Sequence, residues 1–365
     1  MWKILLNILA LAGVCHSIVS DIPSVYGPIP HVGDFSGVDS TKYLKRRPGD
    51  FVHPGIWHTH EDLERIRTNV ISKKDPWASA YEKFSADEYS QANYQMQGPH
   101  AVISRGKISN YTSFAHDVRA AWQNALMWYI TRNQSHWDRT EIMRWEGNWT
   151  EAGAKWQGGS GFSNQLYWLF SRQSVVVGQA NYGMASIKAM LSFAVYLNDV
   201  ELYNYAMNAF IQDNCAGLFA QYHPETGQSV EAGRDQSHTM SGIGWAAYGA
   251  RVGQSQGVDL YSLGHNLLLK ASEYAAKYNL NETVEYDPKW SRCEAVLVNG
   301  PWATISEQRR GVTNQNPIWD ILYYQYVVKR KAKAPWTTKA REFEGFEGAV
   351  SSNDHPSWGG LIWAY

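Results

Sequence analysis

Apolar residues recur at helical spacing along most of this chain, and no long segment alternates between apolar and polar residues as a half-buried strand does. A helix is expected to begin near Thr59, which offers an N-cap before acidic residues in the first turn. Asn198 and Asp199 form a tight polar turn between two helical segments, which predicts a helical hairpin. The clearest stripes predict helices over 114–131, 182–197, 200–211, 241–252, 260–278 and 318–330.

Successive helix pairs must bury their apolar faces against one another, and a closed ring of hairpins is one compact solution. We therefore predict an all-α fold, an (α/α) toroid built of helical hairpins, in one domain over residues 55–365. Residues 21–54 are rich in Pro and Gly and show no periodicity. They are expected to form an extended, disposable N-terminal arm.

Residues 1–20 have the pattern of a cleavable secretory signal. Lys3 precedes an apolar run over 4–14, and small and polar residues follow, which predicts cleavage after Ser17 or Ser20. The run is too short to cross a bilayer, and no later stretch is long and apolar enough. We therefore expect a soluble, secreted, extracellular protein.

Glycosylation and disulfide chemistry fit such a protein. Cys15 lies in the predicted signal, so Cys215 and Cys293 are left as a possible disulfide, with two free buried thiols as the alternative. Four Asn-X-Ser/Thr sequons predict a glycoprotein; they lie at Asn110, Asn133, Asn148 and Asn281.

The chain is rich in aromatic residues, with 17 Trp and 22 Tyr. These side chains suit a packed core, and their flat rings also suit stacking on sugar rings. The excess favours a carbohydrate cleft. The net charge of −1 gives no reason to expect nucleic acid or membrane binding, so a polyanionic partner would need a local basic patch.

One segment, 228–244, concentrates charged and polar residues: Glu231, Arg234, Asp235, Gln236 and His238. Arg234 and His238 are four positions apart and would share a face of a helix. The ordinary pKa of histidine, about 6.5, suits a base at neutral pH. A hydrogen-bonded core histidine is the alternative for His238.

This residue set fits the removal of a proton beside a sugar carboxylate. Such a site must neutralise the carboxylate with hydrogen-bond donors, because negative charge develops there. It also needs a base near the proton and an acid for the leaving oxygen. His, Tyr, Asn and Arg side chains perform these tasks without a metal or other cofactor.

The run from Glu231 to Gly244 resembles the Arg-Asp-Gln-X-His signature of the alginate-lyase domain family, and is closest to polysaccharide lyase family 38. The resemblance covers roughly residues 55–360, and its segments are specific in combination. Further similar segments are 115–131, 181–183, 190–199, 267–279, 284–286, 304–311 and 355–359.

The resemblance implies an (α/α) toroid that acts by β-elimination on 1,4-linked uronic acid polymers, such as alginate or glucuronan. Asn181 would then neutralise the uronate carboxylate, and His238 would be the base or a second neutralising group. Tyr286 would protonate the leaving oxygen, with Tyr182 and Tyr278 as alternatives. Which uronan is cut, and whether within the chain or from its ends, is left open.

The same resemblance implies a substrate site around the catalytic residues. Arg234 and Arg310 would supply positive charge, and Gln236 and Tyr182 would contact the sugar. The implied partner is an anionic uronan polysaccharide, and we expect a monomer.

Two other functions fit parts of the sequence. A glycoside hydrolase would need two opposed carboxylic acids, whereas Glu231 and Asp235 lie four apart, side by side. Glu61, Asp117 and Glu307 are candidates for a more distant partner. A non-catalytic sugar-binding protein would explain the aromatic residues but not the grouping of His, Arg and Asn. The closest approach to metal-ligand spacing is the pair at 58 and 60, in His-Thr-His, so we predict no metal site.

Overall fold

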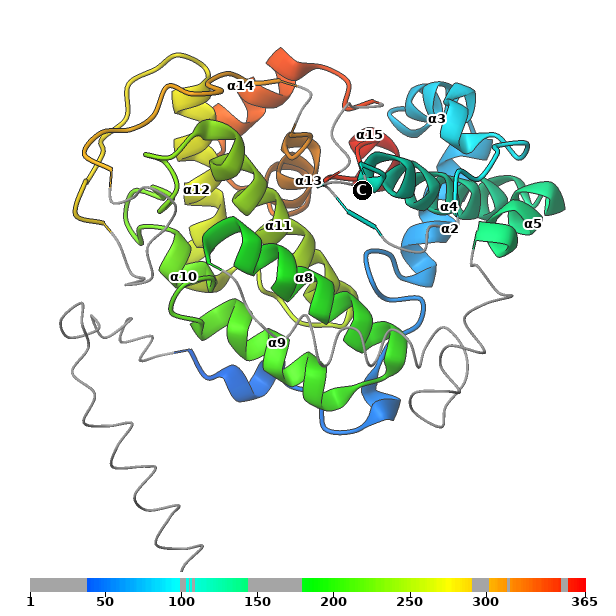
Figure 1. Ribbon diagram of the computed structural model, residues 1–365, viewed down its shortest axis with the longest axis horizontal. Coiled ribbons are helices and arrows are strands. Elements are labelled where there is room, and N and C mark those ends of the chain that lie inside the picture. Colours follow the sequence, from blue (N-terminus) through cyan, green and yellow to red (C-terminus); the bar gives the residue numbers. More distant parts are fainter. Residues whose placement is uncertain are drawn as a thin grey trace, which may run out of the picture.

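The fold is all-α, as predicted (Figure 1). The computed structural model describes residues 38–98, 103–104, 106, 109–143, 179–290, 302–313, 316–348 and 354–365. This part contains helices and turns, with one isolated bridge between Tyr222 and Ser229 in place of a sheet. Among its helices, none has the length and apolar character that a membrane crossing requires.

The helices fall along the whole described chain. The α-helices are α2 (His60–Ile71), α3 (Trp77–Ala86), α4 (Tyr111–Thr131), α5 (Gln134–Met143), α8 (Ala180–Leu197), α9 (Val200–Gln212), α10 (Leu218–Gln221), α11 (Gln236–Ser255), α12 (Leu263–Asn279), α13 (Trp319–Tyr323), α14 (Pro335–Glu344) and α15 (Gly359–Ile362). Short 3-10 turns are η1 (Ser40–Tyr43), η2 (Pro48–Asp50) and η3 (Glu88–Ser90), and η4 (Tyr324–Lys329) is π-helical.

Local sequence chemistry sets the helix ends that were predicted. Thr59 caps α2: its hydroxyl accepts a hydrogen bond from the Asp62 amide, and the Asp62 carboxylate accepts one from the Thr59 amide. Asn198 ends α8 in the left-handed conformation, and the Asp199 side chain accepts from the Leu202 amide to start α9. The predicted hairpin is therefore confirmed.

Helix α11 is the centre of the larger group of helices, α8 to α12 (Figure 1). It is buried on nearly every side and packs against α8 and α12. Its glycines permit close approach: a Cβ on Gly249 would lie 3.0 Å from Phe210, and one on Gly253 would lie 2.8 Å from Leu260. The small residues of this segment are therefore packing positions for neighbouring helices.

The described part of the predicted arm belongs to the folded body. Tyr43 and Phe51 are buried in the core, and the Phe51 ring packs edge-on against Tyr203 of α9 at 5.5 Å. The backbone of Lys45 exchanges two hydrogen bonds with the side chain of Asn204. Residues 38–54 therefore pack as part of the domain, and the expectation of a disposable arm is wrong for them.

Several predictions fall outside the described residues, namely the signal over 1–20, the first part of the arm and Asn148. Cys215 is disulfide-bonded, and Cys293, its predicted partner, also lies outside them. Asn133 and Asn281 are exposed, as attached glycans would require.

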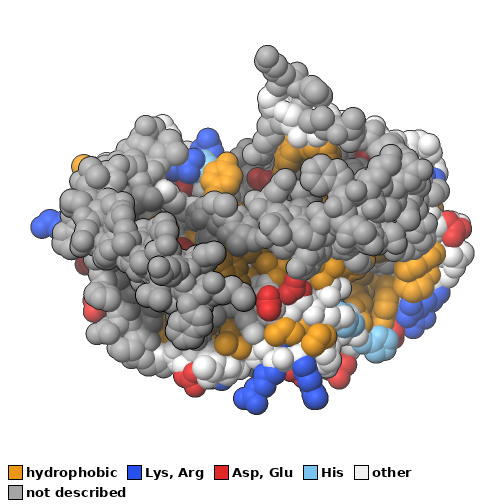
Figure 2. Space-filling view, turned by 60° about the horizontal axis from the view of Figure 1, so that its bottom comes forward, with side chains coloured by type: hydrophobic (Ala, Val, Ile, Leu, Met, Phe, Trp, Pro, Cys, Tyr) orange, Lys and Arg blue, Asp and Glu red, His pale blue; other side chains and the backbone are white. Residues whose placement is uncertain are grey.

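Charge on the described surface is mixed. Figure 2 shows one face, on whose described part Lys and Arg side chains and Asp and Glu side chains are both scattered. This distribution agrees with the net charge of −1. A basic site for an anionic ligand must therefore be local.

Candidate active site

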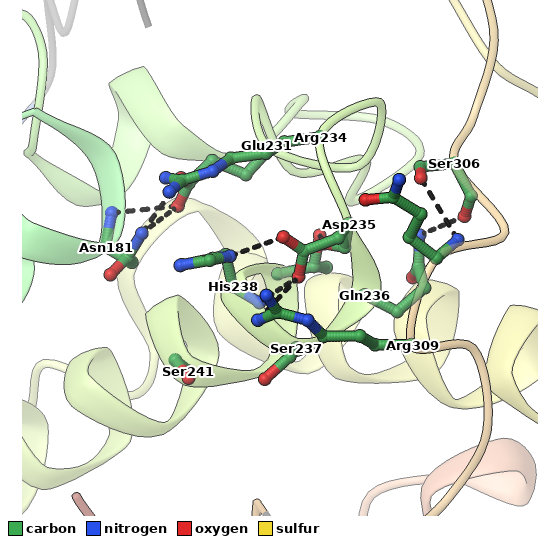
Figure 3. A network of polar contacts seen from close by, with 12 residues as sticks. Asn181, Glu231, Arg234, Asp235, Gln236, Ser237, His238, Ser241, Ser306 and Arg309 are labelled. Carbon is green, nitrogen blue, oxygen red and sulfur yellow. Dashed lines mark hydrogen bonds and ion pairs between the residues drawn. The ribbon is translucent and has the colours of Figure 1, made fainter. Parts of the chain in front are cut away.

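The segment singled out in the sequence forms a turn and the first turn of α11 (Figure 3). Asp235 is the N-cap of this helix, and its Oδ1 accepts from the His238 amide at 2.9 Å. Because α11 begins at Gln236, Arg234 precedes the helix, and the predicted helical face shared by Arg234 and His238 is not formed. Both side chains nevertheless line the same cavity.

His238 and Asp235 form a close pair. The ring Nδ1 of His238 lies 2.5 Å from Oδ2 of Asp235. Burial raises the pKa of Asp235, but hydrogen bonds from the ring and the backbone of His238 outweigh burial and hold the pKa below its ordinary value. An ionised Asp235 accepts the Nδ1 proton, which leaves the Nε2 lone pair of a neutral imidazole free to act as a base.

A second network holds Asn181 beside this pair. The buried carboxylate of Glu231 accepts from the Asn181 amide nitrogen at 2.9 and 2.7 Å, from the Asn181 backbone at 3.0 Å and from Arg234 at 2.8 Å (Figure 3). Seen from the side-chain nitrogen of Asn181, the two oxygens of the Glu231 carboxylate lie in nearly the same direction, whereas the two N–H bonds of that nitrogen point well apart. One N–H of Asn181 therefore serves Glu231, and the other remains for a further acceptor.

Arg234, Asp235 and His238 line a cavity of about 440 Å³, whereas Asn181 lies beside it and is not among the lining residues. Arg309 also lines it: the guanidinium lies 3.8 Å from Asp235, and its side chain is 57% exposed. The sequence reading missed Arg309, because its place depends on contacts between distant segments. The lining residues are Gly233, Arg234, Asp235, His238, Trp302, Ser306, Gln308 and Arg309.

Gln236 makes the contacts that hold the segment 306–309, with Arg309, against the start of α11. Its backbone amide donates to the Gln308 carbonyl at 3.0 Å, and its side-chain nitrogen donates to the Ser306 carbonyl at 2.9 Å. Its side-chain oxygen accepts from Asn279 at 3.2 Å. Gln236 is buried with these groups satisfied, so in this structure it fixes the 306–309 segment against α11 instead of facing the cavity.

Arg310 lies away from the cavity. Its guanidinium donates to the carbonyl of Tyr278 at 2.8 Å and to that of Glu282 at 3.2 Å, and it stacks over the Tyr278 ring. Cationic groups at these positions stabilise the C-terminal end of a helix, here α12. The structure thus places Arg310 and Tyr278 in a helix-end contact, and the neighbouring Arg309 at the cavity.

The predicted acid, Tyr286, lies behind the cavity wall. Its hydroxyl donates to the Trp302 carbonyl at 3.0 Å, and a Cβ on Gly233 would lie 2.6 Å from it. Burial, with a smaller effect from Asp287, raises the pKa of Tyr286, which favours the protonated form that an acid needs. Tyr182, on the first turn of α8, is 59% exposed and does not line the cavity.

A tyrosine that the sequence reading did not single out lies beneath the site. The Tyr222 hydroxyl is fully buried without a hydrogen-bond partner among the described residues, 3.4 Å from where a Cβ on Gly242 would be. Burial, with the nearby Glu231 charge, raises the pKa of Tyr222 well above its ordinary value. No local pattern marks this residue, since its hydroxyl reaches Gly242 of α11, twenty positions further along the chain.

The acids considered for hydrolysis are placed elsewhere or already bonded. Glu231 is held by Asn181 and Arg234, and Asp235 is held by His238. Asp117 accepts from one tyrosine hydroxyl and two backbone amides. The remaining two acids, at 61 and 307, are exposed, and the latter pairs with Arg310. No two of these acids face each other across the cavity that His238 lines.

Other indications of identity are few. The described residues contain no group of three or more His, Cys, Asp or Glu side chains placed to hold a metal ion. His58 stacks on Trp363, and His60 bonds with the Tyr129 hydroxyl.

In comparisons with known proteins, no protein-family model matches the chain, and neither a curated protein nor a solved structure shows significant similarity to it. The functional argument therefore depends on the geometry of the site.

Proposed function

We propose that this protein is a secreted polysaccharide lyase that cleaves 1,4-linked uronic acid polymers, polymannuronate or glucuronan, by β-elimination. The observation that carries the proposal is the His238–Asp235 pair, 2.5 Å apart, at a cavity that also presents Arg234 and Arg309. The ring of His238 would serve as the base there, beside two cationic groups. That combination matches the need to remove a proton next to a carboxylate.

In the proposed reaction, Nε2 of His238 takes the proton from the carbon that bears the carboxylate. The electron pair of that C–H bond forms a carbon–carbon double bond, and the bond to the glycosidic oxygen breaks. The leaving oxygen takes a proton from Tyr286. For this step the Tyr286 hydroxyl must give up its hydrogen bond to the Trp302 carbonyl and donate to the leaving oxygen instead. Asp235 stabilises the imidazolium that forms.

The substrate carboxylate would be neutralised by the second N–H of Asn181 together with Arg234. Glu231 positions both groups, since it bonds to each of them. The charge neutralisation in this scheme comes from side chains, so the proposed reaction requires no metal.

We also propose that the helical hairpins close into an (α/α) toroid. The support is the neighbour relation along the chain: α4 packs on α5, α8 on α9, α11 on α12 and α13 on α14. A monomeric toroid of this kind would place the starts of α8 and α11 at one end of a ring of helices, where the candidate site lies.

The reaction class is tested by incubating the protein with polymannuronate, polyguluronate and glucuronan. A lyase produces ultraviolet absorbance from the new double bond, in step with new chain ends. New reducing ends without that absorbance would indicate hydrolysis and overturn the proposal. Activity should persist in a chelator, and its loss there would contradict the metal-free scheme.

The assigned roles are tested by His238→Ala and Tyr286→Phe. Each should lower the rate by about 100-fold or more, because each removes a proton-transfer group. His265→Ala, at an exposed histidine of α12, is the matched control and should keep the wild-type rate. A near-normal rate for Tyr286→Phe would transfer the acid role to another tyrosine.

A further inference from the structure

A second cavity, of about 330 Å³, lies between α4, α8, α11 and the segment 354–356. Its walls are aromatic, and they include Trp122 of α4 and Trp245 of α11. Arg119 and Lys188 also line it. Flat aromatic walls with cationic groups suit a ligand that has both an apolar face and a negative charge.

Lys188 provides a cationic group that can pair with a ligand in this cavity. Its Nζ lies 4.5 Å from the centroid of the Trp245 ring. Among the described residues, no hydrogen bond or ion pair is formed by this ammonium group. Burial lowers the pKa of Lys188 to about 8, against a smaller opposing effect of Asp354, so the group is still mainly protonated at neutral pH.

His355 supplies polar atoms without partners. It lines the cavity and is 4% exposed, and neither ring nitrogen has a hydrogen-bond partner among the described residues. Its ring stacks on Trp245 at 4.4 Å. Burial lowers the pKa of His355 to about 3, so the ring is neutral, with one donor and one acceptor nitrogen. Buried polar atoms of this kind are normally satisfied, and a ligand hydroxyl would satisfy one.

Helix α11 contributes to both cavities, and α8, which packs against it, contributes to the second. Lys188 follows Asn181 by seven positions on α8, and Trp245 follows His238 by seven positions on α11. Seven residues of helix rise roughly 10 Å, a distance that a short oligosaccharide spans. Helix α11 begins at the first cavity, and Glu231 holds the start of α8 against the segment that leads into α11, since it bonds to Asn181.

We propose that the second cavity binds a uronic acid residue of the same polysaccharide, away from the bond that is cleaved. Its carboxylate pairs with Lys188, its ring stacks on the Trp122 and Trp245 wall, and a hydroxyl bonds with His355. This inference rests on the proposed function, since it takes the ligand to be a uronan. The cavity then favours long chains over short ones.

The test is a titration of tryptophan fluorescence with a uronate hexasaccharide, in the His238→Ala protein to prevent turnover. Lys188→Met should weaken binding by about tenfold, because it removes a charged contact and keeps the side-chain stem. Lys339→Met is the matched control, since Lys339 also lies over a tryptophan ring, at 4.3 Å in α14. It should bind as the parent does. A neutral 1,4-linked hexasaccharide should bind far more weakly than the uronate.

Activity measurements with otherwise wild-type protein complete the test. Lys188→Met should raise KM for polymers by about tenfold with little change in kcat, and should leave cleavage of short oligomers unchanged. His355→Phe, which keeps the ring stack, should raise KM in the same way. Unchanged hexasaccharide binding in both variants, with wild-type near-ultraviolet circular dichroism, would overturn the second site.

The two proposals fail in different ways. Tight, Lys188-dependent binding without any unsaturated product would overturn the lyase and leave the second site standing. Unsaturated product with no effect of Lys188→Met on binding or on KM would leave the lyase and overturn the second site.

Discussion

At the scale of single residues, Asp235 joins helix structure to chemistry. One carboxylate oxygen accepts from the His238 amide, as an N-cap does, and the other accepts from the His238 ring. In Asp235→Asn the cap still requires an oxygen, so the amide nitrogen must face the ring. It would donate to Nδ1 and move the imidazole proton to Nε2, which would abolish the proposed base function of His238.

We therefore expect Asp235→Asn to lower the rate of unsaturated product formation by at least about 100-fold. The free energy of unfolding should change by less than about 1 kcal/mol, because Asn is also a good N-cap. Asp199→Asn is the control: Asp199 caps α9 in the same way but has no histidine ring as a partner. Loss of activity in the control, or full activity in Asp235→Asn, would contradict this account.

A second prediction at the residue scale concerns Lys188 and the pH dependence of hexasaccharide binding. The charged and titratable groups that line its cavity with it are Tyr111, Arg119, Asp354 and His355. Because burial lowers the pKa of Lys188 to about 8, its positive charge is present below that pH and lost above it. Hexasaccharide affinity should therefore fall as the pH rises from 7 to 9 in the His238→Ala protein. The affinity of its Lys188→Met form should stay flat over this range.

At the scale of elements, a buried ion pair joins α2 to α11. Arg251 donates to Asp62 at 2.5 Å, and Arg65 pairs with the other oxygen of Asp62 at 2.8 Å. Burial raises the pKa of Asp62, but Arg251, the Thr59 amide and Arg65 together lower it to about 2. The stabilisation is therefore complete above the unfolded-state pKa of about 3.9 and is lost as the pH falls through about 2.

Asp62→Asn should lower the free energy of unfolding by about 3–5 kcal/mol, because it leaves the Arg251 charge buried without its partner. Urea unfolding at pH 7 measures this loss. The control is Asp259→Asn, which breaks the more exposed pair of Asp259 with Arg330 and should cost less than about 1 kcal/mol. If the two substitutions lowered the free energy of unfolding equally, the buried pair would stabilise the fold no more than the exposed one, contrary to this prediction.

The elements also show which local signals sufficed. The α8–α9 hairpin could be predicted because the apolar spacing and the turn at Asn198 and Asp199 act within a few residues. Helices α5 and α14 were not predicted, because their sequences are polar overall. The buried residues of α14 are only Thr337 and Ala340, and Glu273 of α12 holds its start by accepting two backbone hydrogen bonds. Tertiary packing, absent from local sequence, selects such helices.

At the scale of the whole molecule, three acids lie close together where α13 and α14 meet, and their burial has a cost that depends on pH. Glu347 is buried and accepts from the Asp320 backbone at 2.8 Å, while both oxygens of Glu344 are buried without hydrogen-bond partners among the described residues. Burial, with the nearby Asp320 charge, raises the pKa of Glu344 to about 8 and that of Glu347 well above its ordinary value.

A carboxyl group with a raised pKa holds its proton more tightly in the folded state, so stability falls as pH rises from the unfolded value, about 4.3. For Glu344 the loss continues to about pH 8. We expect Tm to fall between pH 5 and 8, and Glu344→Gln to reduce that fall. Glu342→Gln, at an exposed acid of the same helix, should not. A decline that is identical in all three proteins would contradict the assignment.

The candidate site shows the same division between local and distant information. His238 and Asp235 are three positions apart, so their pairing could be anticipated from the motif. Arg309 and Tyr222 could not, because each reaches the site through contacts between segments far apart in the chain. The resemblance implied Arg310 as a cationic group of the site, yet it is its neighbour, Arg309, that lines the cavity, in the segment that Gln236 holds against α11.

The pairing of charges at this cavity has an electrical consequence. The two arginines, Arg234 and Arg309, are balanced by the carboxylates of Glu231 and Asp235. In the proposed reaction, transfer of the substrate proton to His238 would add one positive charge to the site, at the step in which negative charge spreads onto the uronate. Such a site would bind the transition state more strongly than the substrate, and this difference in binding is what lowers the activation barrier.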